Sequence, residues 1–154
     1  MEKLEKENKL LADKNHSSVI AYLQFLQANI TRMATNSSNT KAFIAVIFTI
    51  LATVLTTTEA ILKYWWLGIV FSILGIILDS YYLAFERMYR KKYNSFCEDI
   101  NSNNLNVENI YNMNPKNTNL KFEYAAEMLD ALSSFSVWGF YILFIIISIL
   151  LKFI

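Results

Sequence analysis

The stretch ILDSYYLAFERMYRKKYNSF, residues 77–96, turns from a membrane segment into a charged helix. Its first residues end an apolar run, and its second half carries several Lys and Arg. An acid, Asp79, stands between the two parts. An ionisable side chain within a membrane helix is costly and marks a packed or functional position. The stretch therefore predicts a helix that crosses a membrane and continues to about residue 100, with Asp79 at the transition.

Composition places the chain among membrane proteins of one domain. It has 154 residues, of which 55% are hydrophobic, and a net charge of +1 that gives no overall attraction to nucleic acid. One cysteine, Cys97, excludes an internal disulfide, and one histidine, His16, argues against a histidine-based site. Residues 1–20 lack the apolar core of a secretory signal.

Three apolar runs are long enough to be membrane spans, at residues 42–58, 64–85 and 135–154. The short segment TEAILK joins the first two, which predicts a helical hairpin. We expect an all-α protein with three transmembrane helices, in four parts. These are a cytoplasmic amphipathic region (1–40), the hairpin (41–85), a cytoplasmic part with a helix, an Asn-rich loop and a short helix (86–134), and the third span (135–154).

Basic residues predict the orientation. Six Lys and Arg precede the first span, six lie between the second and third, and only Lys63 and Lys152 lie on the opposite side. The excess predicts a cytoplasmic N-terminus and a C-terminus outside the cell. In a bacterium this is the inner membrane.

Local patterns describe the parts outside the spans. Residues 2–14 are charged and helix-prone, and Ser17 and Ser18 are suitable caps for a second helix. Asn36–Thr40, NSSNT, predicts a break before the first span, 101–119 a loop, and 121–133 a short helix. The apolar seam of the second helix packs either on the chain's own cytoplasmic helices or on other copies. It comprises Val19, Leu23, Leu26, Ile30 and Met33.

One stripe follows the second span with alternating spacings of four and three. It runs through Gly68, Ser72, Gly75, Asp79, Tyr82, Glu86, Tyr89 and Tyr93. Its small residues favour close approach of a second helix in lipid. The first span has a similar stripe, on which we expect the packing to occur. It comprises Ala45, Thr49, Ala52 and Thr56.

Asp79 and Glu86 have two interpretations. Either could form a structural ion pair with Lys41, Arg32 or Arg87. Alternatively, the stripe lines the inner mouth of an oligomeric pore that favours cations. The pore or gate residues would be Ser72, Asp79, Tyr82 and Glu86.

The basic residues below the span also have two interpretations. They contact anionic lipid, or they line a pocket for an anion such as a nucleotide phosphate. The candidate ligand residues are Asn29, Arg32, Asn36, Ser37, Lys41, Arg87, Arg90 and Lys91. Glu86 and Arg90 can also pair within one helix turn.

Catalytic patterns are missing from the sequence. No Gly-rich phosphate loop, CxxC, HExxH or GxSxG occurs. We therefore expect no enzyme activity, no cofactor and no metal site.

Three segments carry a family resemblance: LQANITRMATNSSNTKAF (26–43), LDSYYLAFERMYRKKYNSF (78–96) and SFSVWGFY (134–141). They resemble small three-span bacterial membrane proteins of anti-phage operons with the patterns IxRMAxNS…K and LDxYYLxxERxxRxLY. The first pattern matches Ile30, Arg32, Met33, Ala34, Asn36, Ser37 and Lys41. The second matches Asp79, Tyr81, Tyr82, Leu83, Glu86, Arg87, Arg90 and Tyr93. Ala42 and Phe43 stand where that family carries a tryptophan-containing start to the first span.

The membrane effector of Hailong-type defence is the closest functional analogy. The resemblance implies a homo-oligomeric ion channel, which we expect to be a tetramer. It also implies control by a short oligonucleotide from a companion nucleotidyltransferase, and growth arrest through membrane depolarisation. A different hypothesis is a membrane scaffold that recruits a soluble defence enzyme through the seam of residues 19–33.

Overall fold

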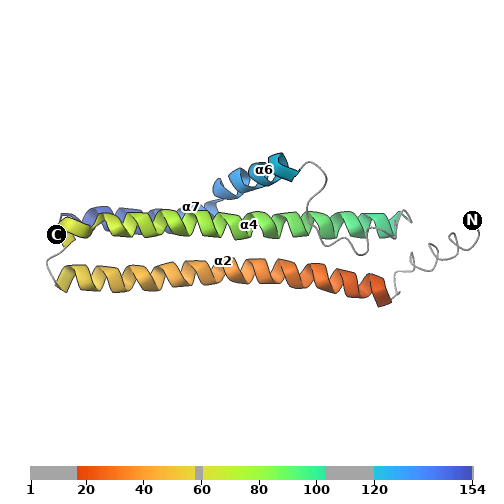
Figure 1. Ribbon diagram of the computed structural model, residues 1–154, viewed down its shortest axis with the longest axis horizontal. Helices are drawn as coiled ribbons and strands as arrows, with labels where there is room; N and C mark the ends of the chain where they lie inside the picture. Colours follow the sequence, from red (N-terminus) through yellow and green to blue (C-terminus); the bar gives the residue numbers. More distant parts are fainter. Residues whose placement is uncertain (1–16, 58–60, 103–119, 154) are drawn as a thin grey trace, which may run out of the picture.

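The computed structural model describes residues 17–57, 61–102 and 120–153, which are almost entirely helical (Figure 1). The expectations for residues 2–14 and for 103–119 of the predicted 101–119 loop lie outside these residues, whereas Asn101 is helical and not part of a loop. The helices are α2 (Ser17–Thr57), the single turn α3 (Ile61–Tyr64), α4 (Trp66–Asn101), α6 (Leu120–Leu132) and α7 (Phe135–Leu151). The extension of the second span to about residue 100 and the short helix before the third apolar run are confirmed.

Helices α2 and α4 run antiparallel, side by side, along the whole molecule (Figure 1). No glycine or proline occurs within residues 17–57, so nothing in the backbone interrupts α2. At 1.5 Å per residue, its 41 residues extend about 60 Å, roughly twice the hydrocarbon thickness of a bilayer. Each long helix is therefore longer than a bilayer crossing requires.

The predicted break at Asn36–Thr40 is wrong, because α2 continues through it. The hydroxyl of Thr40 donates to the carbonyl of Asn36, 2.8 Å away, and Ser37 is buried against α4. Side chains that favour turns in isolation are thus satisfied within the helix and by a tertiary partner.

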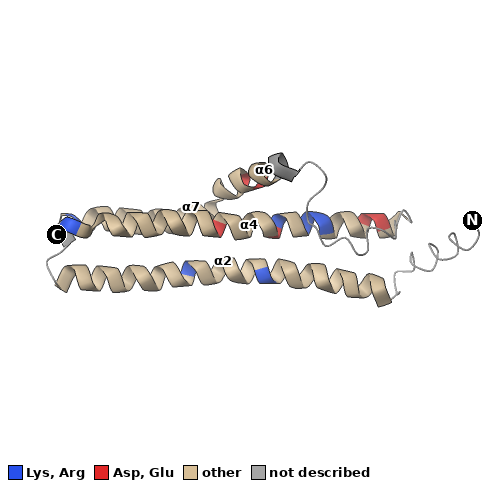
Figure 2. Cartoon of the chain, viewed as in Figure 1, with Lys and Arg blue, Asp and Glu red and all other residues tan. Residues whose placement is uncertain are grey.

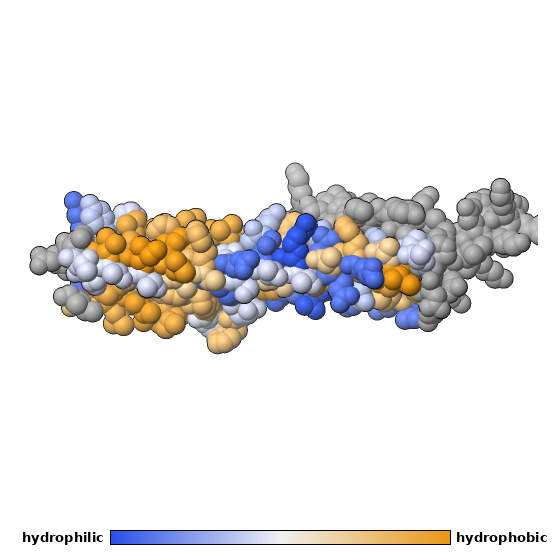
Figure 3. All heavy atoms as spheres, turned by 90° about the horizontal axis from the view of Figure 1, so that it is seen from below, coloured by the Kyte–Doolittle hydropathy of each residue, from blue (hydrophilic) through white to orange (hydrophobic). Residues whose placement is uncertain are grey.

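Two helices, α2 and α4, are long and apolar enough to cross a membrane. The apolar surface covers the end of the molecule nearest the α2–α4 connection, and polar surface begins near the middle (Figure 3). Helix α7 has 17 residues and meets the length requirement only together with α6, from which it is bent by 52°. The third span therefore stays a prediction.

Large side chains pack on the glycines of α4 in the apolar half. A Cβ added at Gly68 would lie 2.2 Å from Ser148 Oγ of α7 and 3.0 Å from the Phe48 ring of α2. A Cβ at Gly75 would lie 2.4 Å from the Tyr141 ring and 3.1 Å from Ile44. The two glycines are therefore the positions at which α2 and α7 both reach α4.

The predicted packing face of α4 is correct for its apolar half, where Gly68, Ser72, Gly75 and Asp79 are buried. The predicted face of α2 is wrong. Its buried residues are Ile44, Phe48 and Leu55, whereas Thr49 and Thr56 are exposed. Large side chains of α2 therefore pack against small residues of α4, and the predicted contact between small residues of both helices does not occur.

Beyond the apolar half, α2 and α4 share a separate hydrophobic core of Val19, Tyr22, Leu26, Phe96 and Ile100. The Tyr22 and Phe96 rings meet edge to face with centroids 4.7 Å apart, and burial raises the pKa of Tyr22. Val19 and Leu26 of the predicted seam are buried here, and Leu23 packs against them. The interpretation in which the seam packs on the chain's own helices is the one that the structure shows.

Candidate functional site

Asp79 is the first charged residue of α4. Along α2 and α4, charged residues begin near the middle of the molecule (Figure 2). It is completely buried, with 0% of its surface exposed. The Ser37 hydroxyl donates a hydrogen bond to Asp79 Oδ1, and Lys41 Nζ lies 2.7 Å from Oδ2. Lys41 Nζ also donates to Ser37 Oγ at 3.3 Å. Ser37, Lys41 and Asp79 thus form one closed polar cluster, which we call the Asp79 cluster.

The Lys41–Asp79 contact is an ion pair without the alignment of a hydrogen bond at Oδ2. Lys41 keeps 22% of its side chain exposed, whereas the Asp79 side chain is not exposed at all. A buried charge of this kind depends on its partner, because desolvation costs several kcal/mol per ion. Of the interpretations made from the sequence, the ion pair of Asp79 with Lys41 is the one that this geometry matches.

A second buried polar atom lies nearby on α7. The Tyr141 side chain is completely buried, and its hydroxyl has no hydrogen-bond partner among the described residues. Its ring lies on Gly75, one turn before Asp79 in α4. By contrast, the hydroxyls of Ser72, Ser80 and Ser148 donate to carbonyls of their own helices. Tyr141 therefore brings an unsatisfied hydroxyl of α7 to the level of the Asp79 cluster.

The predicted pore residues lie in different environments. Asp79 and Ser72 are enclosed within the chain, whereas Tyr82 and Glu86 are half-buried. Glu86 pairs with Arg90 of the next turn at 2.8 Å, as its spacing predicted. A single chain thus presents no open lumen lined by these four side chains.

The eight predicted ligand residues divide by their partners. Asn29 donates to the Phe25 carbonyl at 2.9 Å and accepts from Arg32 at 2.8 Å. Ser37 and Lys41 belong to the Asp79 cluster. Arg87 and Lys91 pair with carboxylates of α6, and Arg90 pairs with Glu86. Most of the predicted cations are therefore already neutralised within the chain.

The partners on α6 were not identified from the sequence. Arg87 pairs with Asp130, and Lys91 pairs with Glu127. Lys92, beside them on α4, has a pKa lowered by burial. The available signal was the match between two cations four residues apart and two acids three residues apart in a predicted helix.

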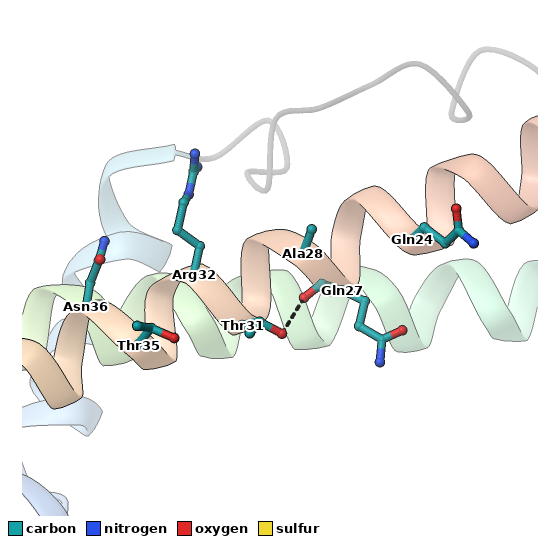
Figure 4. A pocket seen from close by; sticks show the side chains of 7 residues that line it. All are labelled: Gln24, Gln27, Ala28, Thr31, Arg32, Thr35 and Asn36. Carbon is teal, nitrogen blue, oxygen red and sulfur yellow. Dashed lines mark hydrogen bonds between the residues drawn. The ribbon is translucent and has the colours of Figure 1, made fainter.

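Two predicted ligand residues, Arg32 and Asn36, also line a surface hollow of about 610 Å³ on the polar half of α2 (Figure 4). Its other lining residues are Gln24, Gln27, Ala28, Thr31 and Thr35. Thr31 donates to the Gln27 carbonyl at 3.0 Å, and the Arg32 side chain extends away from the helix. All of these residues come from α2, so the hollow lies along one helix and not between two.

Metal-ligating side chains do not gather anywhere in residues 17–57, 61–102 and 120–153, where no group of three His, Cys, Asp or Glu could hold an ion. Cys97 is a free, half-buried thiol.

Comparison with known proteins adds no relative. No protein-family model, no curated protein and no solved structure matches the chain. The resemblance to Hailong-type membrane effectors therefore stays a prediction.

Proposed function

We propose that the protein is an oligomeric, ion-conducting membrane effector of a bacterial anti-phage system. A nucleotide signal from a partner nucleotidyltransferase gates it, and its opening depolarises the inner membrane and arrests growth. One observation carries the proposal: a fully buried carboxylate, Asp79, paired across helices at the edge of the apolar half.

The first argument is the free energy that burial of that carboxylate costs. Membrane helices hold ionisable groups rarely, and mostly where they face a bundle interior or a water-filled path. An apolar residue at position 79 would give an equally well packed hairpin without the desolvation cost. Because the pair sits where the apolar half ends, breaking it would bring a carboxylate to the inner mouth of a path between subunits. Such a ring of carboxylates favours cations.

The outward face of α2 is the second argument. Thr49, Thr53 and Thr56 are exposed in the apolar half, with each hydroxyl bonded to a carbonyl one turn earlier. This face is less apolar than that of Phe43 and Ile50, which are also exposed and suit lipid. Three helices cannot enclose an aqueous path, so several copies are required. Closed rings of identical subunits are the common solution, and we propose a tetramer with the threonine faces inward.

The membrane arrangement belongs to the same proposal. Helix α7 forms a third span, the N-terminus and the polar halves of α2 and α4 lie in the cytoplasm, and the C-terminus lies outside. The Lys152 ammonium, 5.1 Å from the Trp65 ring centroid, would then anchor α7 at the outer interface.

Ion flux from liposomes tests the proposal. The full chain is reconstituted with an entrapped fluorescent cation indicator, with and without a short oligodeoxyadenylate. We expect flux that responds to the oligonucleotide and changes at least severalfold in Asp79→Asn. Glu98→Gln removes one exposed acid of α4 far from the cluster and should behave like the unmodified chain.

The absence of flux in every condition, with intact oligomers by native mass, would overturn the channel. The scaffold would then be the better hypothesis. Its partner would need a surface other than the 19–33 seam, because α4 occupies much of that seam.

A further inference from the structure

Helix α6 lies against α4 beyond the apolar half (Figure 1), and both helices carry charged residues where they meet (Figure 2). Arg87 and Lys91 are one turn apart and therefore on one face. Asp130 pairs with the first and Glu127 with the second. Two carboxylates held at this spacing occupy the positions that two anionic groups of a ligand would take.

Each ion pair between α6 and α4 has one exposed member. Asp130 has 69% of its side chain exposed and Lys91 has 66%, whereas Arg87 keeps 30% and Glu127 only 11%. Water and salt reach each pair from its exposed side and weaken it, the Arg87–Asp130 pair more than the pair of the buried Glu127. The remaining contacts include the Tyr124 ring on Phe85, with centroids 5.5 Å apart, and the buried Ala131. A ligand with several negative charges can therefore compete with α6 for both cations.

The connection between α6 and α7 allows such an exchange. Only Ser133 and Ser134 separate the two helices, and Ser134 is extended with φ −68° and ψ 128°. The helices are bent by 52° at this point. Because the helical hydrogen bonding already ends here, α6 can leave α4 by rotation at the two serines without unwinding α7.

We propose that Arg87 and Lys91 form a phosphate-binding surface that α6 covers, and that the phosphates of a soluble ligand displace Glu127 and Asp130. This rests on the proposed function, for which it supplies the site of the nucleotide signal. Guanidinium and ammonium groups bind phosphate by charge-assisted hydrogen bonds. Displaced α6 would pull on α7 through the two serines, and Tyr141 of α7 packs beside the Asp79 cluster.

A ligand from solution is favoured over a lipid headgroup by position. Lys91 is six residues beyond Phe85, the last residue of the apolar run, which places it about 9 Å further along the helix. Arg90 beside it has 60% of its side chain exposed. These cations face the aqueous side of the interface.

Binding is measured by fluorescence anisotropy of a labelled short oligodeoxyadenylate with the full chain in neutral detergent. Glu127→Gln with Asp130→Asn removes the competing charges and keeps the side-chain sizes. We expect binding about threefold to tenfold tighter, from two pairs that are each exposed on one side. Glu98→Gln with Asp99→Asn is the matched control, since it removes the same charge from α4 and should leave affinity within twofold.

A charge swap tests whether Lys91 itself binds the ligand or whether only the net charge of the chain matters. Lys91→Glu with Glu127→Lys keeps the net charge and the pair but reverses its polarity. We expect it to lose binding about as fully as Arg87→Gln with Lys91→Gln. If the swap binds like the unmodified chain, Lys91 is not a phosphate ligand and the inference is wrong.

A second set of measurements shows whether the phosphate belongs to a soluble ligand or to a lipid. It also tests the phosphate-binding surface independently of ion conduction. The same variants are measured in micelles that contain phosphatidylglycerol. A response to the lipid alone overturns the soluble ligand and leaves a headgroup site. Oligonucleotide binding that tightens as expected, in a chain that passes no ions, would support the covered surface while the channel fails. If the chain conducts ions but the α6 variants bind the oligonucleotide like the unmodified chain, the covered surface is wrong and the channel stands.

Discussion

Helices α2 and α4 pack against each other differently in the two halves of the pair. In the apolar half, Gly68 and Gly75 let Phe48, Ile44 and Tyr141 approach the α4 backbone. In the polar half, Val19, Tyr22, Leu26, Phe96 and Ile100 meet as large side chains on both helices.

The difference is the one expected if the apolar half lies in lipid and the polar half in water. Lipid gives no hydrophobic gain on association, so close contact and polar pairs must hold helices together. In water, the burial of large side chains provides about 25 cal/mol per Å². The four substitutions below contrast the halves and are ordered from the largest expected loss of stability to the smallest. Each is measured as the free energy of unfolding in neutral detergent, followed by circular dichroism.

Removal of the cation from the Asp79 cluster should be the most damaging change. Lys41→Met leaves the buried carboxylate without its counter-charge, which should cost about 3–5 kcal/mol. Lys41→Met combined with Asp79→Asn should recover most of the loss, because no charge is then buried. Equal stability of the single and double variants would show that the ion pair does not hold α2 to α4.

Truncation in the polar half should come next. Leu26 is completely buried, and Leu26→Ala should cost about 2–3 kcal/mol through lost apolar contact and a residual cavity. Ile20→Ala, at a side chain that is 41% exposed on the same helix, is the control. A loss at Ile20 as large as that at Leu26 would contradict the location of this core.

An added methyl group tests the apolar half. Gly68→Ala places a Cβ 2.2 Å from Ser148 Oγ and should cost about 1–2 kcal/mol by overpacking. Ser148→Ala in the same chain removes that oxygen and should recover part of the loss. No recovery in the double variant would mean that α7 does not lie on Gly68.

The exposed threonine face should be the least sensitive. Thr49→Val should change stability by no more than about 0.5 kcal/mol, because its hydroxyl bonds only its own helix. Thr49 was predicted from the sequence to lie in the α2–α4 contact, so a large loss would restore that prediction.

Much of α4 could be predicted from the sequence because its faces differ strongly in residue size and charge. The spacing of Gly68, Ser72, Gly75 and Asp79 identified the buried face, and the absence of breakers after residue 85 predicted the long extension. The short helix predicted at 121–133 corresponds to α6, with each end displaced by one residue. The face of α2 was missed because alanines and threonines suggested contact between small residues, whereas α4 supplies the space for Ile44 and Phe48.

The site was only partly predictable, since its key pairs join distant segments. Lys41 was one of three candidate partners of Asp79, and no local pattern distinguished it. Ser37 was hidden within NSSNT, which in isolation favours a turn. The unsatisfied hydroxyl of Tyr141 depends on how α7 lies against Gly75, which spacing along one helix does not reveal.

The unbroken course of α2 through Asn36–Thr40 makes it a stiff lever. Ser17 lies 24 residues away from Lys41 of the Asp79 cluster, which corresponds to about 36 Å of helix. A tilt of the α2–α4 pair by about 5° at the level of Lys41 would displace the far end by about 3 Å, from the helix rise. A flexible segment at Asn36–Thr40 would absorb such a movement and would not transmit it along α2.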